Sequence, residues 1–431
     1  MPADSTGSFP QNKGEMKPDW YILPKTAYTT DLGLQLGLVG YVYLFGDGSG
    51  YPDPHHSLSG DFVYYTKGRT RADLSYDSEY LIPNMRVSAV ALYVNDPLYQ
   101  FYGFNGAAQK YDPAEYAAQF GMDRSLLCLT TNFQGKITGN LHWAAGAAFW
   151  RYWTGNLQGR FADKYFIDGV DNTFYKQYCD AGLIRNDEAG GGTHMEFKAG
   201  LSFDNRNIEA SPDRGIWAEL YLSGSPDLFG VGMTNGRYDY LKLNARFRHF
   251  LTLPIKWNNG GGIVLAYNLA YQGTVAGQVP FYLQQNINSL VPRSIISEGL
   301  GGQNTIRGVY SNRLIGDGYA WANAELRIKI ISADYDGHNL YLAANPFFDL
   351  GAIVQAYRPE ESYDFLKKIE PGLSYEDFSK EAHRWAKSAG IGMKLGVDYN
   401  LIISAEFAKN LDESRGLYNG VYVNLGIGYS F

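Results

Sequence analysis

The stretch NGVYVNLGIGYSF (419–431) decides the fold class, because its residues alternate between two kinds of side chain. One face carries the apolar and aromatic residues Val421, Val423, Leu425, Ile427, Tyr429 and Phe431. The other face carries Tyr422, Asn424, Gly426, Gly428 and Ser430. A period of two is typical of a β-strand and not of a helix. A strand face that is wholly apolar up to the last residue predicts contact with lipid.

The composition agrees with a membrane barrel. The chain has 431 residues, 45% hydrophobic and 19% charged, with 35 Tyr and 50 Gly; its mean hydropathy is -0.29. No run approaches the roughly 18–20 apolar residues that a membrane-spanning helix needs. A barrel has low average hydropathy because every second residue faces a polar lumen, and it is rich in interfacial Tyr and Trp. The net charge of -7 gives no indication of nucleic-acid binding.

The same alternation recurs along the chain in segments of about ten residues separated by turn-forming residues. This pattern predicts an all-β fold, a transmembrane antiparallel barrel of about sixteen strands. We place the first strand at 27–45 and the last at 420–431, and expect helical loop structure only near 360–387. A soluble propeller is the alternative, but it needs a repeat of about 40 residues. It would also leave large apolar patches exposed.

Two parts of the chain are expected. Residues 1–26, rich in Gly, Pro and polar residues, predict an extended or disordered periplasmic N-terminal arm; residues 27–431 form the barrel. The first twenty residues lack the apolar core of a signal peptide. Either the chain is cytosolic or this is a mature form whose signal peptide is removed or not included, and the barrel pattern favours the mature form. Cys128 and Cys179 fit no metal spacing, and whether they pair stays open.

The stretch GGQNTIRGVYSNRLIGDGYAWANAELRIKI (301–330) resembles the signature of the superfamily that includes BamA, TamA and the two-partner secretion transporters, also described as the bacterial surface antigen barrel. In that family a long extracellular loop carries an aliphatic-Arg-Gly-aromatic tetrad and folds back into the lumen. The corresponding residues are Ile306, Arg307, Gly308 and Val309. The fourth departs from the usual aromatic, and Tyr310 follows it. A partner motif, aromatic-x-Asp-x-Gly, matches Phe347, Asp349 and Gly351, and Glu325 lies on the intervening strand.

The chemistry of this set is consistent. An Arg inside a barrel is costly unless its guanidinium meets carboxylates in a fixed geometry. Asp349 and Glu325 would supply two, and Gly308 would let the loop approach the wall closely. We therefore expect Arg307 to tether the loop inside the lumen.

A second segment, LSFDNRNIEASPDRGIWAELYL (201–222), is similar to the family's mid-barrel hairpin. Its matching residues are Asp204, Arg206, Pro212, Gly215 and Glu219. An ordinary hairpin is the alternative, because any turn uses Asn, Asp, Pro and Gly.

The resemblance also implies what to look for elsewhere in the chain. Family members that assemble outer-membrane proteins usually carry periplasmic POTRA domains before the barrel. A domain needs at least about 50 residues, and only about 26 precede the expected first strand. We expect a barrel-only, POTRA-lacking member. A patatin-type lipase domain and its Gly-x-Ser-x-Gly elbow are not found in the sequence either.

The expected mechanism rests on the seam between the first and last strands. Glycines there leave few cross-strand side-chain contacts, which would make this the weakest join. The expected seam residues are Leu32, Gly33, Leu34, Leu36, Gly37, Leu425, Gly426, Ile427, Gly428 and Phe431. The alternative is that these glycines merely pack against lumen side chains.

Three functions stay open at this point. The first is an outer-membrane biogenesis barrel that moves an amphipathic cargo, phospholipid or client protein, through the seam. It would work in outer-membrane lipid of a Gram-negative bacterium, with a client, a periplasmic partner or a second copy at the seam as partners. The second is a passive diffusion channel, or a structural barrel within a larger complex. The third is a hydrolase; with scattered histidines and no metal motif, we expect no enzyme, cofactor or metal.

Overall fold

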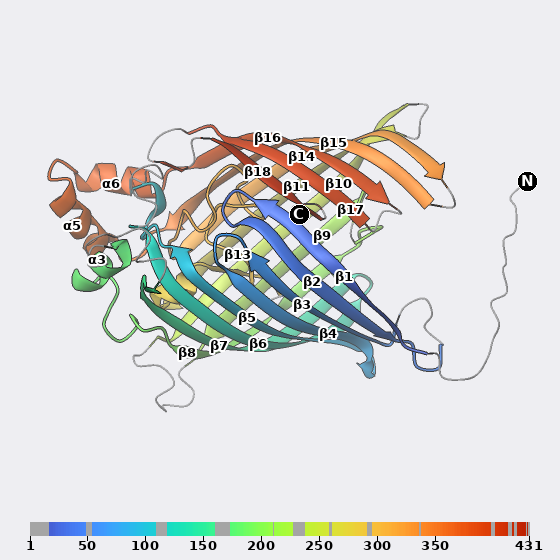
Figure 1. Ribbon diagram of the computed structural model, residues 1–431, viewed down its shortest axis with the longest axis horizontal. Helices are drawn as coiled ribbons and strands as arrows, with labels where there is room; N and C mark the ends of the chain where they lie inside the picture. Colours follow the sequence, from blue (N-terminus) through green and yellow to red (C-terminus); the bar gives the residue numbers. More distant parts are fainter. Residues whose placement is uncertain are drawn as a thin grey trace, which may run out of the picture.

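The computed structural model describes residues 17–48, 54–108, 119–159, 173–209, 211–226, 238–257, 261–290, 295–335, 338–397, 401–412, 416–417, 420–427 and 429. Within this part of the chain, sixteen strands form a closed antiparallel barrel, which confirms the predicted fold class (Figure 1). In sequence order the first eight strands of the wall are β1 (Asp19–Thr29), β2 (Gly33–Leu44), β3 (His56–Tyr65), β4 (Thr70–Ile82), β5 (Met85–Gln100), β6 (Gly121–Thr138), β7 (Leu141–Asn156) and β8 (Thr193–Asp204). The other eight are β9 (Gly215–Ser225), β10 (Tyr240–Trp257), β11 (Gly261–Gly277), β14 (Gly318–Tyr335), β15 (His338–Gln355), β16 (Ala386–Val397), β17 (Leu401–Asn410) and β18 (Val421–Ile427).

Burial in the barrel is inverted relative to a soluble protein, as strand β17 illustrates. Its apolar residues Ile403 and Phe407 are 51% and 42% exposed, whereas Glu406 between them is 2% exposed. Because neighbouring residues of a strand point to opposite faces, the apolar residues face outward and the polar ones face the lumen. No helix among the described residues is long and apolar enough to cross a membrane.

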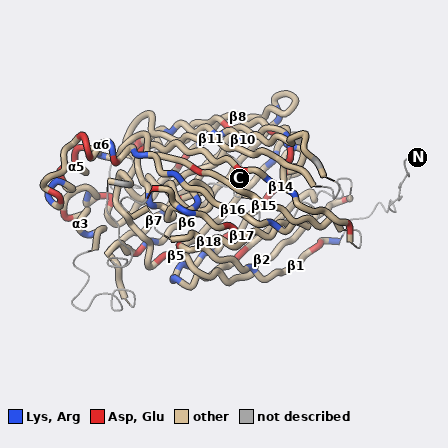
Figure 2. The backbone as a smooth tube through the Cα atoms, turned by 90° about the horizontal axis from the view of Figure 1, so that it is seen from above, with Lys and Arg blue, Asp and Glu red and all other residues tan. Residues whose placement is uncertain are grey.

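The two ends of the barrel differ. One end, here called the turn end, carries the start of β1 and short connections such as 83–84 and 139–140. The other, the loop end, carries the long connections with helices α3 (Phe174–Asp180), α5 (Pro359–Ile369) and α6 (Tyr375–Ala382) (Figure 1). Helices α5 and α6 lie in the segment where helical loop structure was expected. Charged residues gather around these three helices (Figure 2).

The connection between β11 and β14 contains three further short elements. They are α4 (Phe281–Gln284), β12 (Asn286–Asn288) and β13 (Ile295–Glu298), and β12 pairs with β13 in a separate two-stranded sheet. A 3-10 turn, η1 (Gly106–Ala108), follows β5. The long connection between β11 and β14, residues 278–317, is here called the lumen loop.

The predicted first strand at 27–45 is wrong. Two strands occupy this region, and β1 begins at Asp19, so the boundary predicted between residues 26 and 27 falls inside β1. The tight turn at 30–32 interrupts the alternating pattern, and Gly33 adopts a positive φ of 76° beside it. Pro24 lies within β1, and a proline argues against a strand in sequence-based prediction, although it is tolerated in an edge strand. Of the predicted arm, residues 1–16 lie outside the described residues.

Candidate functional site: the lumen loop and the closing join

The lumen loop places Arg307 at the centre of a buried ionic network. Its side chain is 1% exposed. The guanidinium Nε donates to Asp349 Oδ2 at 2.8 Å and Nη2 donates to Asp349 Oδ1 at 2.9 Å, while the backbone N–H of Arg307 donates to the same carboxylate. Nη1 donates to Glu325 Oε2 at 3.3 Å and to Glu406 Oε1 at 3.1 Å. The structure thus brings Arg307 to Asp349 and Glu325, and adds a third carboxylate.

The wall strands around Arg307 complete its surroundings. Asp349 lies on β15, Glu325 on β14 and Glu406 on β17, so the network spans neighbouring strands of the wall. The Phe347 ring lies 3.5 Å from Arg307 Cζ, in cation–π geometry. Glu406 also accepts from Lys394 Nζ at 2.8 Å. Burial of an Arg is thereby matched by several carboxylates and an aromatic face, which makes its position energetically acceptable.

The other motif residues fix the loop against the wall. Ile306 and Val309 are fully buried, in one cluster with Trp321 of β14. Gly308 has φ +86°, and an added Cβ would lie 3.1 Å from the backbone of Lys409 in β17. At Gly351 an added Cβ would lie 2.8 Å from Ile306 Cδ1. Val309, which departs from the family's aromatic residue, therefore fills an apolar position, while Tyr310 stacks on Tyr102 with ring centroids 6.1 Å apart.

The join that closes the barrel is short. Between β1 and β18 the registered pairs in the described chain are Tyr28↔Leu425 and Thr29↔Asn424. Thr30 extends this join by donating its backbone N–H to Val423 O at 3.1 Å. Beyond β18, Tyr429 lies in the lumen, with its ring 3.8 Å from Arg327 Cζ. The part of β1 from Asp19 to Ala27 therefore has β2 on one side and no registered partner on the other within the described residues.

This unpaired part of β1 exposes large apolar side chains. Trp20 is 71% exposed and Ile22 63% exposed. On the lumen face, Tyr21 of β1 contacts Tyr41 and Tyr43 of β2, with ring centroids 5.4 and 5.8 Å apart. In a bilayer, open strand edges carry a cost for each unpaired backbone group.

The loop-end half of the closing join is held by one carboxylate that sequence reasoning did not identify. Asp31, in the turn between β1 and β2, accepts from Tyr422 Oη of β18 at 2.6 Å. It also accepts from Ser311 Oγ and Ser311 N of the lumen loop, at 2.8 and 3.2 Å. Burial raises the pKa of the Asp31 carboxyl, and the hydrogen bonds from Tyr422 and Ser311 partly offset that rise. Asp31 thus connects both sides of the join to the loop.

Several expected seam residues lie elsewhere. Leu32 belongs to the β1–β2 turn, and Gly33, Leu34, Leu36 and Gly37 belong to β2, whose partners are β1 and β3. The reason is the missed strand β1, which stands between β2 and β18. On the other side, Leu425 does lie at the join, whereas Gly426 and Ile427 extend past its last registered pair. Gly428 and Phe431 lie outside the described residues.

The hairpin residues belong to β8, β9 and the turn that joins them: Asp204 ends β8, Arg206 and Pro212 lie in the turn, and Gly215 and Glu219 lie on β9. Arg206 donates to both oxygens of Asp204, at 3.0 and 2.7 Å. Gly215 has φ +108°, and an added Cβ would lie 2.6 Å from Asn205 O, so glycine is required there. Pro212 O accepts from Arg327 Nη1 at 3.2 Å, and Glu219 accepts from Leu290 N of the lumen loop at 3.1 Å. The hairpin and the lumen loop therefore contact the same inner wall.

The loop end is packed with aromatic side chains. Phe101 and Phe104 of the β5–β6 connection contact Tyr178 of α3, each with ring centroids 5.3 Å apart. Phe365 of α5 lies 4.8 Å from the same Tyr178 ring, and Tyr357 belongs to the same buried cluster. This packing joins three separate connections over the lumen.

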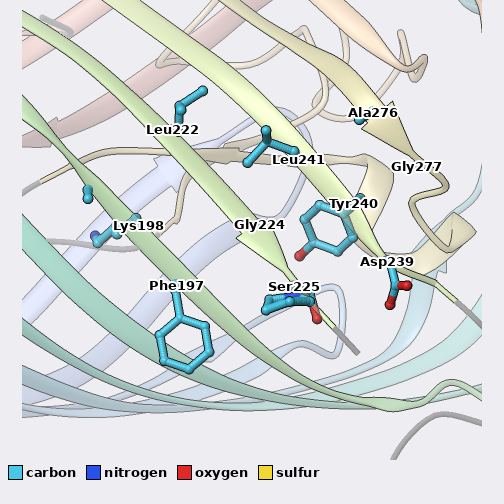
Figure 3. Close-up of a pocket in the computed structure, with 12 residues that line it drawn as sticks. Phe197, Lys198, Leu222, Gly224, Ser225, Asp239, Tyr240, Leu241, Ala276 and Gly277 are labelled. Atoms are coloured by element: carbon cyan, nitrogen blue, oxygen red, sulfur yellow. The ribbon is translucent and has the colours of Figure 1, made fainter. Parts of the chain in front are cut away.

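Two further features of the barrel are an outer hollow and its two cysteines. A hollow of about 550 Å³ lies at the outer wall where β8, β9 and β10 approach the loop end, lined by Phe197, Leu222 and Leu241 (Figure 3). Cys128 is buried and Cys179 partly buried, and these two described residues form no disulfide. Among the described residues no group of three His, Cys, Asp or Glu side chains could hold a metal ion.

Comparisons with known proteins agree with this architecture. A family model described as the Omp85 superfamily domain matches residues 61–431. No curated protein sequence matches significantly. The fold is similar to that of BamA from Haemophilus ducreyi lacking POTRA domains 1–3, with 15% identity, a TM-score of 0.58, and 96% and 71% of the two chains covered.

The fold is also similar to two CdiB structures. CdiB from Escherichia coli is 10% identical, with a TM-score of 0.56, and 96% of this chain and 64% of that chain are covered. CdiB from Acinetobacter baumannii is 9% identical, with a TM-score of 0.50, and 96% and 60% are covered. The chain thus spans less than two thirds of either CdiB chain.

Proposed function

This chain belongs to the Omp85 superfamily, and we propose that it is an outer-membrane biogenesis barrel that moves an amphipathic cargo through the join of β1 and β18. The cargo is a phospholipid or a client outer-membrane protein. Related barrels of this superfamily are Gram-negative outer-membrane proteins that assemble or secrete other proteins. In this orientation the turn end faces the periplasm and the loop end faces outward, and the barrel acts without a catalytic residue.

The observation that carries the proposal is the imbalance around β1. Eleven residues of β1, Asp19 to Thr29, are registered with β2, and two described residues are registered with β18. Ladder hydrogen bonds are what hold a barrel wall closed in lipid. The join with the fewest of them costs least to open, and its periplasmic half already presents the edge of β1.

A coupling between loop and join supports the same proposal. The lumen loop is anchored to the wall by Arg307 and to the join by Ser311, which donates to Asp31. Glu406 accepts from both Arg307 and Asn424 of β18. A cargo that displaces the loop would therefore weaken the hydrogen bonds that close the join.

A passive diffusion channel is a weaker candidate. It requires an open lumen, whereas the lumen loop is buried within this barrel and aromatic side chains are packed at the loop end. A second copy at the open edge of β1 is a specific alternative partner, since an unpaired strand edge can add a strand from another chain. Both alternatives give distinct results in the experiment below.

The test uses reconstituted liposomes and one pair of engineered disulfides. In a background in which Cys128 and Cys179 are Ser, Tyr28→Cys with Leu425→Cys bridges the closing join, because these residues are registered partners. Tyr28→Cys with Leu34→Cys bridges β1 to β2 instead and is the matched control. Folding of an outer-membrane client and flip of a labelled phospholipid are measured in oxidised and reduced protein.

We expect cargo movement to stop only in the oxidised Tyr28–Leu425 variant and to recover on reduction. Client insertion that stops identifies a protein cargo, and lipid flip that stops without client insertion identifies a lipid cargo. Equal activity in both oxidised variants would refute passage through the join. Ion conductance alone, indifferent to the bridge, would identify a channel, and dimers that disappear on bridging would identify a second copy at the edge.

A further inference from the structure

Four arginines lie together on the inner wall on the turn-end side of Arg307. Arg246 and Arg248 lie on β10, Arg327 on β14, and Arg206 in the β8–β9 turn; we call them the arginine cluster. The strands β10, β11 and β14 are neighbours, and Arg248 is registered with Asn268 of β11. Their charges act on one another, since Arg246, Arg206 and Arg327 all contribute to the electrostatic field at Arg248.

Acidic partners are shared unequally within the arginine cluster. Arg206 binds both oxygens of Asp204. Arg327 Nε donates to Glu325 Oε1 at 2.7 Å, but Glu325 also serves Arg307. Glu325 is therefore shared between Arg327 and Arg307.

Arg246 and Arg248 have fewer acidic neighbours. Arg246 is registered opposite Glu219, which is the carboxylate that acts on Arg248 as well. Arg248 lies over the Trp217 ring, 4.7 Å from its centroid, and forms no ion pair with a described residue. The arginine cluster is therefore more positive than its surroundings.

Polar atoms in the arginine cluster are buried without partners. Arg246 is 6% exposed, and neither its Nε nor that of Arg248 has a hydrogen-bond partner in the described part of the chain. A buried guanidinium N–H is normally bonded, and leaving it unbonded is unfavourable. An anion between these two arginines would accept from both and would also reduce the repulsion within the cluster.

We propose that the arginine cluster is a binding site for a phosphate group, with Arg248 and Arg246 as its principal donors. Arginine is suited to phosphate because its planar fork donates two parallel hydrogen bonds to adjacent oxygens. The phosphate comes either from the head group of an anionic phospholipid or from free inorganic phosphate. As a head-group site it rests on the proposed function and names the cargo as an anionic lipid.

The position of the arginine cluster favours the lipid head group. Tyr429, which follows β18 where the join with β1 has ended, contacts Arg327 with its ring. One member of the arginine cluster, Arg327, therefore contacts the residue that follows the join, while Arg246 and Arg248 lie on β10, further around the inner wall. The lumen face of β1 and β2 near the open half of the join carries apolar and aromatic residues, Leu23 with its registered partner Val39 and Tyr21 with Tyr41. A lipid there would have its phosphate at the arginines and its acyl chains toward the bilayer.

The experiment measures binding directly, in the whole barrel purified in detergent. Isothermal titration calorimetry is done with short-chain phosphatidylglycerol, with inorganic phosphate and with a short-chain diacylglycerol that lacks phosphate. Arg248→Gln removes both the charge and the paired guanidinium donors, whereas Arg248→Lys keeps the positive charge without the paired donors. Arg214→Gln is the matched control, because Arg214 is an exposed arginine at the same end of the barrel. Heat-modifiability on gels confirms that each variant is folded.

We expect phosphatidylglycerol to bind wild type and Arg214→Gln equally, about tenfold more weakly to Arg248→Gln, and with intermediate strength to Arg248→Lys, because a bidentate charge-assisted contact is lost. The diacylglycerol should not bind at this site. Binding of inorganic phosphate alone, dependent on Arg248, would retain the phosphate site but overturn the lipid head group. Equal binding to Arg248→Gln and Arg214→Gln for both phosphate probes would overturn the site itself.

The two proposals fail separately. Binding in detergent requires no opening of the join, so the titration is repeated with the oxidised Tyr28–Leu425 bridge. Arg248-dependent binding that persists in this bridged protein while liposome transport is indifferent to the bridge would refute the proposed function and leave the site. Transport that depends on the bridge but not on Arg248 would support the proposed function and refute a role of the arginine cluster in it.

Discussion

Strand β1 is joined to its two neighbours very differently. With β2 it forms a continuous ladder from Asp19↔Tyr43 to Thr29↔Gly33. With β18 the described ladder covers Tyr28 and Thr29. The first neighbour follows directly in the chain through a tight turn, whereas the second comes from the other end of the sequence. A hairpin closes over few residues, but the last join must close over nearly the whole chain and has the larger entropic cost.

Different interactions stabilise the two regions of this barrel. The wall from β14 to β17 is held by ladders and by the buried ionic network around Arg307. The closing join has a short ladder and depends on side chains, Asp31 and Tyr422, that reach it from the edge. The lumen loop contacts both regions, so a change in the loop should alter the stability of the closing join.

The largest effect is expected from removing Arg307. Arg307→Ala leaves Asp349, Glu325 and Glu406 buried without their common partner, which costs about 3–5 kcal/mol for a buried ion pair. The free energy of unfolding in urea should fall by that amount and the heat-modifiability transition should shift to lower temperature. Arg214→Ala, an exposed arginine, is the control. A stable Arg307→Ala variant would show that the loop is not a tether.

A smaller effect is expected at Glu406, which links the network to β18. It accepts from Arg307, Lys394 and Asn424, at 3.1, 2.8 and 3.3 Å. Glu406→Gln keeps the shape of the side chain but loses its charge, so the free energy of unfolding should fall by about 1–3 kcal/mol. The urea midpoint measures this change against Glu209→Gln, an exposed control. If Glu406→Gln matched wild type, the third carboxylate would contribute nothing to the network.

The next effect tests the join itself. Asp31→Ala removes three hydrogen bonds that connect the β1–β2 turn to β18 and the loop, and we expect a local net loss of about 1 kcal/mol at the join. Amide hydrogen exchange should speed up in β18 and at Tyr28 and Thr29, with little change between β2 and β3. Asp31→Asn keeps two acceptor lone pairs and should show a smaller increase. Equal changes in exchange rate around the whole barrel would contradict a local role of Asp31 at the closing join.

The smallest effect is a pH dependence at the same residue. Because burial raises the pKa of Asp31 above 3.8, the folded state binds its proton more tightly than the unfolded chain does. Wild type should therefore gain stability relative to Asp31→Asn as the pH falls from neutral toward about 4, and gain no more below the unfolded pKa of about 3.9. Lys67 and Tyr422, the other titratable groups acting on Asp31, are the same in both proteins. Parallel urea midpoints across this range would contradict a raised pKa.

The motif residues of the lumen loop could be predicted because their residue types indicate a buried arginine paired with carboxylates. A tetrad with Arg307, and Asp349 between an aromatic residue and a glycine, has few other uses at such spacing. Glu406 was missed although a signal existed, since it is the acidic residue on the inward face of LIISAEFAKN (401–410). Asp31 and Tyr422 gave no signal, because residues that far apart in the chain meet only when the barrel closes.

The barrel, the outward and inward faces of its strands, and the family signature could be predicted from the amino-acid sequence. Those properties follow from side-chain alternation and local motifs, which require no knowledge of distant contacts. The folded structure was needed to show that β1 begins at Asp19, that Gly33 and Gly37 lie away from the join, and that Asp31 links β18 to the lumen loop. It also decided which arginines share a carboxylate and which do not. The physical reason is that the register of the closing join and the charge balance of the lumen depend on residues hundreds of positions apart, which only closure of the barrel brings together.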